Sequence, residues 1–254
     1  MTVPFDAELE LAKRASRAAG AIQLTRRGAE SVDLKEDASP VTEVDRRCEA
    51  LIRGELLGAF PDDGFLGEES GTAGGTSGRT WIVDPLDGTR PYIRGIVTHA
   101  VLIALEDAAG LGLGVIHLPA MDLTCWAARG GGAFCNGEPA RVSATATVAD
   151  SIGSGLGFLQ RYDEPLGARA FELMRRTGYS YGFMDAYSYV CLATGSIDFC
   201  VNLLDAPWDC AAAAAIIAEA GGRWSDAAGV ETVHRGTFVA SNGVLHREVL
   251  DALR

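Results

Sequence analysis

Apolar side chains recur every three or four positions in two stretches near the start of the chain. In residues 7–28 they are Leu9, Leu11, Ala12, Ala15, Ala19 and Ile22, and in residues 41–60 they are Val44, Cys48, Leu51, Ile52, Leu56 and Leu57. One face of an α-helix repeats with this period, so the pattern predicts two amphipathic helices. Ser39 and Thr42 are the candidate N-caps of the second helix.

Short apolar runs separated by turn residues follow these helices. They predict a strand that ends at Gly67 and strands over residues 80–83, 100–105, 112–117 and 124–128, with a turn before residues 133–135. Residues 70–79 are rich in Gly, Ser and Thr, which predicts a mobile loop.

The character of the sequence changes near residues 141–143. Beyond a connector rich in Thr and Ala, predicted strands alternate with predicted helices. The strands cover residues 151–156, 197–203, 222–225 and 237–240, and the helices cover residues 168–176, 186–195, 208–220 and 244–253. Such alternation is typical of an α/β fold. We therefore predict an N-terminal α+β half, residues 1–142, and a C-terminal α/β half, residues 143–254.

The composition excludes some classes of function. Of the 254 residues, 48% are hydrophobic, which is enough to bury a sizeable core. The net charge of −12 argues against a nucleic-acid-binding surface. The chain starts without a secretory-signal pattern, and no apolar run reaches membrane-spanning length. We therefore expect a cytoplasmic protein without nucleic-acid or membrane partners.

The cysteines show no metal-binding pattern. They are Cys48, Cys125, Cys135, Cys191, Cys200 and Cys210. None has the spacing of a zinc site, and most lie in apolar runs, where free Cys behaves as a small hydrophobe. We predict that all six are reduced and buried.

Two carboxylates at the end of a predicted strand carry the strongest chemical signal. Asp84 and Asp87 lie three residues apart in the run Trp-Ile-Val-Asp-Pro-Leu-Asp-Gly-Thr. Pro85 fixes one backbone angle, so both carboxylates can converge across a tight turn. Carboxylate oxygens suit Mg²⁺, and the N–H groups of Gly88 and Thr89 suit an anion beside it. The alternative is an ordinary Asp-Pro-x-Asp-Gly turn.

Further acidic motifs in a fixed order carry a family resemblance. Glu68 and Glu69 follow an apolar pair upstream, and Asp209 opens an Ala-rich helix that ends in Glu-Ala-Gly-Gly. An early motif runs from Lys35 to Asp45. This series resembles the inositol monophosphatase superfamily over nearly the whole chain. The resemblance implies a layered α/β/α/β/α sandwich, with the site where the two halves meet.

The resemblance also implies a Mg²⁺-dependent, Li⁺-sensitive phosphomonoesterase with two or three bound ions. By motif, Glu68 and Asp84 would hold the first ion together with the carbonyl of Leu86. Asp84 would bridge to a second ion held by Asp87 and Asp209. The alternatives are an exposed loop acid for Glu68 and a helix N-cap for Asp209.

The resemblance also implies functions for residues that do not bind the metal ions. Thr89 would orient the attacking water, and Asp45 would accept the Thr89 hydroxyl proton. The N–H groups of Gly88 and Thr89 would bind the phosphate. Glu69 and Lys35 would support the metal ligands without binding the ion. Outside the motif, an acid such as Asp45 on a helix is usually an exposed solvated residue.

The substrate is less clearly indicated. The aromatic segment 179–187 resembles the histidinol-phosphatase branch, in which Asp185 would face a substrate amine; the alternative is a helix N-cap. Asn202 stands where the family usually carries an acid that binds substrate hydroxyls, and Arg90-Pro91-Tyr92 also departs from the pattern.

These departures predict a small polyol, sugar or amino-alcohol phosphate as substrate. The alternatives are inositol 1-phosphate, a 3′-phosphoadenosine nucleotide, or a non-catalytic regulatory protein that binds metal or ligand. The resemblance also leads us to expect a homodimer.

Overall fold

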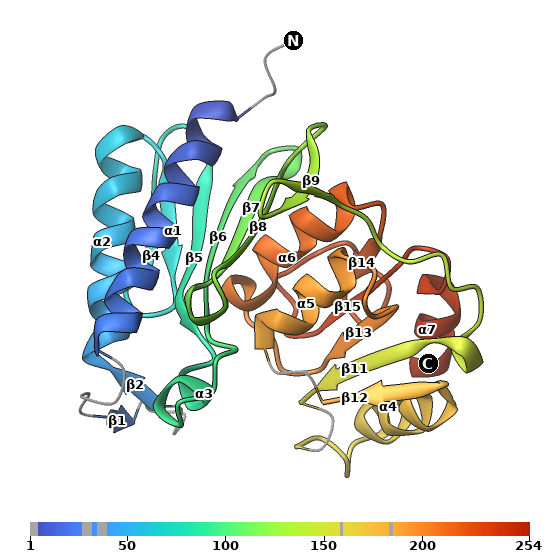
Figure 1. The fold of residues 1–254 in the computed structure, drawn as a ribbon. Coiled ribbons are helices and arrows are strands. Elements are labelled where there is room, and N and C mark those ends of the chain that lie inside the picture. The colour runs from blue at the N-terminus through green and yellow to red at the C-terminus, as the bar shows by residue number, and fades with distance from the viewer. Residues whose placement is uncertain (1–4, 27–31, 35–39, 158–159, 183–184) are drawn as a thin grey trace.

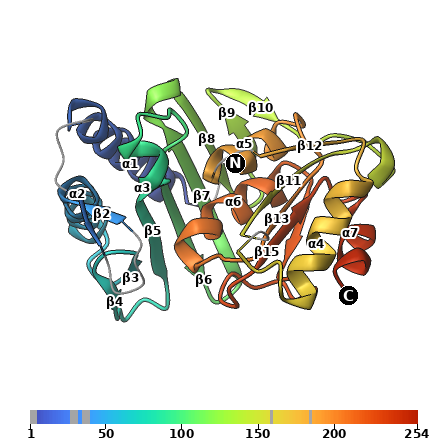
Figure 2. The same cartoon turned by 90° about the horizontal axis from the view of Figure 1, so that it is seen from below.

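The computed structural model describes residues 5–26, 32–34, 40–157, 160–182 and 185–254, which form five stacked layers (Figure 1). Helices α1 (Asp6–Arg26) and α2 (Glu43–Ala59) cover one face of an eight-stranded sheet. Helices α5 (Asp185–Ala193) and α6 (Pro207–Glu219) lie between this sheet and a five-stranded sheet, as Figure 2 also shows. Helices α4 (Pro165–Arg176) and α7 (His246–Leu253) cover the outer face of the second sheet. The predicted α/β/α/β/α sandwich is confirmed.

The eight-stranded sheet has the order β10-β9-β8-β7-β6-β5-β3-β4. Its strands are β3 (Gly64–Gly67), β4 (Gly71–Ala73), β5 (Thr80–Asp87), β6 (Ala100–Asp107), β7 (Gly110–Leu118), β8 (Leu123–Ala128), β9 (Gly132–Cys135) and β10 (Glu138–Ala140). Neighbours are antiparallel except for β3 and β5, which run parallel. Strand β4 lies inside the segment 70–79 that we predicted as a loop.

The five-stranded sheet has the order β12-β11-β13-β15-β14. Its strands are β11 (Ile152–Leu156), β12 (Tyr179–Tyr181), β13 (Phe199–Asn202), β14 (Arg223–Ser225) and β15 (Phe238–Ser241). Strand β11 runs parallel to both of its neighbours, and the remaining pairs are antiparallel. The remaining elements are β1 (Val32–Leu34), β2 (Pro40–Thr42), α3 (Thr89–Ile93) and the 3-10 turns η1 (Pro119–Met121) and η2 (Val148–Asp150).

The two sheets are formed by different parts of the chain, and the division between them lies close to the boundary predicted at residue 142. The first uses residues 64–140 and the second residues 152–241. However, α6 from the second part packs against β6 and β7 of the first sheet. A Cβ atom on Gly114 of β7 would lie 2.3 Å from the carbonyl oxygen of Ala212, so this close approach requires glycine. The division into halves at residue 142 therefore stays a prediction.

The core lies in three apolar clusters. One lies between α1, α2 and the first sheet, one surrounds α5 and α6 between the two sheets, and one lies between the second sheet and helices α4 and α7. Residues 100–105 of β6 are all fully buried because helices cover both faces of this sheet. For the same reason β6 appears in the sequence as a continuous apolar run. Among the described residues, no helix combines the length and the apolar character that crossing a membrane requires. The cytoplasmic location and the homodimer stay predictions.

One prediction about the cysteines is wrong. Cys125 and Cys135 form a disulfide between β8 and β9. The two residues are register partners in this antiparallel pair, so the hairpin brings their side chains together. A separation of ten residues along the chain gives no sign of this pairing. The other four cysteines are free and buried, as predicted.

Candidate active site

The Asp-Pro-Leu-Asp turn is the centre of the site. It interrupts the pairing of β5 with β6: Asp84 pairs with Leu102, and the next paired residue of β5 is Asp87. Pro85 has no N–H to donate to the ladder. The N–H of Leu86 instead donates to Oδ1 of Asp84 at 2.9 Å. The strand therefore continues to Asp87, beyond its predicted end at residue 83.

Three carboxylates converge at this turn. One oxygen from each of Asp84, Asp87 and Asp209 lies within 4.8 Å of the other two. Asp209, near the start of α6, also accepts the N–H of Ala206 at 2.7 Å, so it caps the helix and joins the cluster. Glu68 lies outside this tight group but hydrogen-bonds to the carboxyl group of Asp84.

The carboxylates of the cluster repel one another, and Asp84 is buried whereas Asp87 and Asp209 are half-buried. Asp84 is only 2% exposed. Burial raises its pKa well above the ordinary value, and the charges of Glu68, Asp87 and Asp209 add to the effect. Burial also raises the pKa of Asp87, and the negative charge of Asp185 raises it further. Two like charges 4 Å apart repel by about 4 kcal/mol at an effective dielectric constant near 20. An all-oxygen donor set of this charge fits a divalent cation such as Mg²⁺.

The hydroxyl of Thr89 lies beside the cluster and contacts a buried acid. Its oxygen lies 3.2 Å from Oδ1 of Asp45, to which it donates, and also 3.2 Å from the carbonyl oxygen of Leu86. Asp45 is 1% exposed, and its Oδ2 accepts the N–H and the hydroxyl of Thr42 in a capping box at the start of α2. Burial raises the pKa of Asp45, and the Thr42 hydrogen bonds partly offset this. Asp45 is therefore not an exposed helix residue.

Gly88 connects the turn to the short helix α3. Its φ of +76° lies in the left-handed region, and a Cβ atom there would be 3.0 Å from Oδ2 of Asp185. The turn and the start of α5 are therefore in close contact. The N–H of Ala186 also donates to Oδ2 of Asp87 at 2.7 Å. Burial raises the pKa of Asp185 to about 6, and its buried Oδ2 has no hydrogen-bond partner.

A cavity of about 550 Å³ opens over these residues. Glu68, Asp87, Gly88, Thr89 and Asp209 line it, together with Arg90, Asp185, Tyr189, Asn202 and Asp205. The structure thus brings together the predicted metal, phosphate and substrate residues. Lys35 lies outside the described residues. Glu69 is half-buried, and its N–H donates to Oε2 of Glu49.

Sequence reasoning missed two polar residues of the site. Gln23 is fully buried in α1, and its amide donates to the carbonyl oxygen of Pro85 at 2.9 Å. Its Oε1 is 2.7 Å from Nδ1 of His99, which is fully buried. Gln23 therefore connects α1 to the metal-binding turn. The second missed residue is Asp205, which lines the cavity. Neither Gln23 nor Asp205 belongs to a sequence motif.

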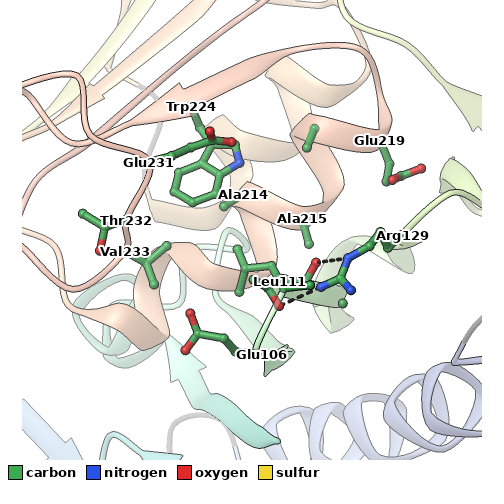
Figure 3. Close-up of a pocket in the computed structure, with 14 residues that line it drawn as sticks. Glu106, Leu111, Arg129, Ala214, Ala215, Glu219, Trp224, Glu231, Thr232 and Val233 are labelled. Carbon is green, nitrogen blue, oxygen red and sulfur yellow. Dashed lines mark hydrogen bonds between the residues drawn. The ribbon is translucent and has the colours of Figure 1, made fainter.

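A second cavity, of about 380 Å³, lies elsewhere in the molecule (Figure 3). It shares no lining residue with the first cavity. Arg129 there is bound to Asp107 and to the carbonyl groups of Gly110 and Leu111. Glu219 accepts the N–H groups of Gly130 and Gly132. These charged groups hold the ends of the β-hairpins in place, so the acidic turn remains the candidate active site.

Comparisons with known proteins identify the family of this chain. The inositol monophosphatase family matches residues 6–254. The chain is 37% identical to a histidinol-phosphatase of Chlorobaculum parvum, over 97% of this chain and 96% of the relative. It is 36% identical to an inositol-1-monophosphatase of Mesorhizobium japonicum, over 100% and 96%. The crystal structure of the suppressor protein suhB from Bartonella henselae superimposes with a TM-score of 0.91 at 31% identity, covering 98% of this chain and 99% of that one. With this fold, its acidic turn and these relatives, the chain belongs to the inositol monophosphatase family of phosphomonoesterases.

Proposed function

We propose that this phosphomonoesterase hydrolyses the phosphate ester of a small amino alcohol, with histidinol phosphate as the representative substrate. The observation that carries the proposal is Asp185. Its carboxylate lines the cavity beside Gly88 and has a buried oxygen without a partner. A carboxylate in this position suits an ammonium group. The similarity to a histidinol-phosphatase over 97% of the chain supports the same substrate class.

Two or three Mg²⁺ ions are the proposed cofactor. Glu68, Asp84, Asp87 and Asp209 would hold them, together with the carbonyl oxygen of Leu86. When bound, such ions neutralise the phosphoryl oxygens and make a bound water more acidic. We also expect inhibition by Li⁺.

The remaining chemistry belongs to side chains and backbone groups of the chain. Asp45 accepts the hydroxyl proton of Thr89, which turns the lone pairs of the Thr89 oxygen towards the attacking water. The N–H groups of Gly88 and Thr89 hold the phosphate. Phosphoryl transfer requires the attacking water in line with the leaving oxygen, and Thr89 would hold the water for this attack.

A neutral polyol phosphate, such as inositol 1-phosphate, is the second candidate substrate. From sequence, Asn202 favours it, because an amide can both donate to and accept from hydroxyl groups; in the structure this amide already binds Asp205 and Tyr189. Sugar phosphates and 3′-phosphoadenosine nucleotides remain alternatives from sequence. The non-catalytic alternative is disfavoured, because each predicted metal ligand lies at the site.

A substrate panel tests the proposal directly. Phosphate release would be measured with histidinol phosphate, inositol 1-phosphate, a sugar phosphate and adenosine 3′,5′-bisphosphate, each with Mg²⁺ and with EDTA. We expect Mg²⁺-dependent release with the highest kcat/KM for histidinol phosphate. A higher kcat/KM for a neutral ester would contradict the proposed substrate class, and release that persists in EDTA would contradict the metal requirement.

Asp185→Asn should reduce selectivity for the amino substrate. The substitution removes the charge with little change in volume, and a charge-assisted hydrogen bond is worth about 1.5–3 kcal/mol. The ratio of kcat/KM for histidinol phosphate to that for inositol 1-phosphate should therefore fall by roughly 10–100-fold. In the wild type this ratio should also fall as the pH decreases through about 6, where Asp185 takes up a proton. Equal losses on both substrates would identify Asp185 as a structural residue.

The stabilisation by Mg²⁺ should increase with pH. Because the pKa values of Asp84 and Asp87 are raised in the folded protein, their contribution to stability is present at low pH and is lost as the pH rises through them. A bound cation reverses this loss. At about 100 times Kd, Mg²⁺ adds about 2.7 kcal/mol, or roughly 5–10 °C in Tm. Thermal unfolding with and without Mg²⁺ should show a larger increase in Tm at pH 8 than at pH 5.5; equal increases would contradict the assignment.

A further inference from the structure

Asp205, in the loop between β13 and α6, lines the cavity and belongs to no sequence motif. It lies four residues before Asp209 and is 8% exposed. Its own N–H donates to the carbonyl oxygen of Gly236, and the guanidinium of Arg161 donates to the carbonyl oxygen of Leu203. Both ends of the loop are therefore fixed, and the position of Asp205 is defined by the fold.

Three neutral side chains contact the carboxylate of Asp205: Asn202, Tyr189 and the thiol of Cys210. Its Oδ1 accepts the amide of Asn202 at 2.6 Å, and its Oδ2 accepts the hydroxyl of Tyr189 at 3.2 Å. The amide of Asn202 is also 3.2 Å from the Tyr189 oxygen, and Oδ1 of Asn202 accepts the N–H of Leu204. The amide of Asn202 is thus used within the protein. Burial raises the pKa of Asp205 well above its ordinary value, and the charge of Asp209 adds to this, so a cation beside it would favour the ionised form. An ionised carboxylate can accept about four hydrogen bonds, so Asp205 can accept one more from a ligand.

The balance of charge in the cavity indicates what that ligand carries. Among the described residues that line it, five are acids and only Arg90 is basic. With Asp84 included and with two divalent ions, the smaller of the proposed numbers, the ions match the charge of the four proposed carboxylate ligands, which leaves Asp185 and Asp205. Buried charges are favourable only when they are paired, and the partners of Asp205 are neutral. A substrate with a positively charged alcohol portion would supply the missing charge, whereas a neutral polyol would not.

We propose that Asp205, positioned by Asn202 and Tyr189, determines the selectivity of this enzyme for phosphate esters of positively charged alcohols. The proposal rests on the proposed function and deepens it, since it identifies a second carboxylate that faces the substrate. It also changes the role of Asn202, which becomes a positioning residue.

The test compares two product inhibitors that occupy different parts of the site. Histidinol carries the positive charge, and inorganic phosphate binds where the metals and Thr89 lie. In Asp205→Asn the new side chain can still accept from Asn202 and donate to Tyr189, so the loop should keep its shape. We expect the ratio of the inhibition constants, histidinol over phosphate, to rise by about 10–100-fold, the loss of one charge-assisted hydrogen bond. The matched control is Asp163→Asn, which removes an exposed acid outside the cavity and should leave the ratio unchanged.

An exchange variant separates selectivity from stability. Asn202→Asp combined with Asp205→Asn retains an amide–carboxylate pair and the total charge. It should recover much of the histidinol binding that Asp205→Asn loses, with Tm measured in parallel for all variants. A ratio that stays constant in Asp205→Asn would overturn the proposal, and so would a decrease in Tm without a change in the ratio.

Different experimental results would contradict the role of Asp205 and the proposed phosphatase activity. If the wild type prefers histidinol phosphate but Asp205→Asn leaves the ratio of the inhibition constants unchanged, only the role of Asp205 is overturned. If no ester is hydrolysed, calorimetric titration of the Mg²⁺- and phosphate-loaded protein with histidinol still tests Asp205 independently. Absence of a difference between wild type and Asp205→Asn in that titration would also overturn the inference.

Discussion

Asp84→Asn should remove most of the turnover while the protein keeps its fold. Asp84 is a proposed ligand of the Mg²⁺ ions, and the loss of its charge would cost several kcal/mol of transition-state stabilisation, or at least about 10²-fold in kcat. The Oδ1 atom of asparagine can still accept the N–H of Leu86, so the turn should persist. Steady-state kinetics over a range of Mg²⁺ concentrations provide the measurement.

The same variant should show an opposite effect on stability without metal. The raised pKa of Asp84 means that its charge opposes folding above that pKa. An amide removes this charge and can donate to Glu68, so the Mg²⁺-free variant should unfold at a Tm equal to or above that of the wild type at pH 8. Its Tm should rise less on addition of Mg²⁺. Full turnover at saturating Mg²⁺ would show that Asp84 is not a metal ligand.

The parts of the fold that were predicted correctly are those in which local pattern and tertiary burial agree. Helix α1 and strand β6 are long enough to show a clear period or a continuous apolar run, and both lie close to their predicted bounds. The missed strands β1, β2, β4, β10 and β12 have three residues each, too few to show a period. Such strands form because a neighbouring strand supplies hydrogen bonds, which local sequence does not reveal.

Site residues that lie in a sequence motif were predicted, whereas those that reach the site only through the fold were missed. Asp84, Asp87 and Thr89 were found because a rigid turn places them within six residues. Asp45 was found only through a family motif, because its contact with Thr89 spans 44 residues. Gln23 and Asp205 carry no local signal. Each is a single polar residue whose importance comes from a buried hydrogen bond or a cavity wall that the fold creates.

Thr89→Val should lower kcat by about 10²-fold or more with little change in Mg²⁺ affinity. Valine keeps the branched shape but removes the hydroxyl that joins Asp45 to the attacking water, and the loss of a proton-transfer partner typically costs 10²–10⁴-fold. Mg²⁺ affinity, measured from the metal dependence of both kcat and Tm, should remain close to that of the wild type, because no carboxylate is altered.

Thr89→Ser is the matched control for this substitution. Serine retains a hydroxyl that can donate to Oδ1 of Asp45, and Oδ2 of Asp45 stays anchored by Thr42 whichever residue occupies position 89. Serine should therefore recover most of the kcat that valine loses. If valine instead weakens Mg²⁺ binding and kcat is restored at high Mg²⁺, then Thr89 acts through the metals and does not position the water. If valine and serine reduce kcat equally, the methyl group of Thr89, and not its hydroxyl, is what the site requires.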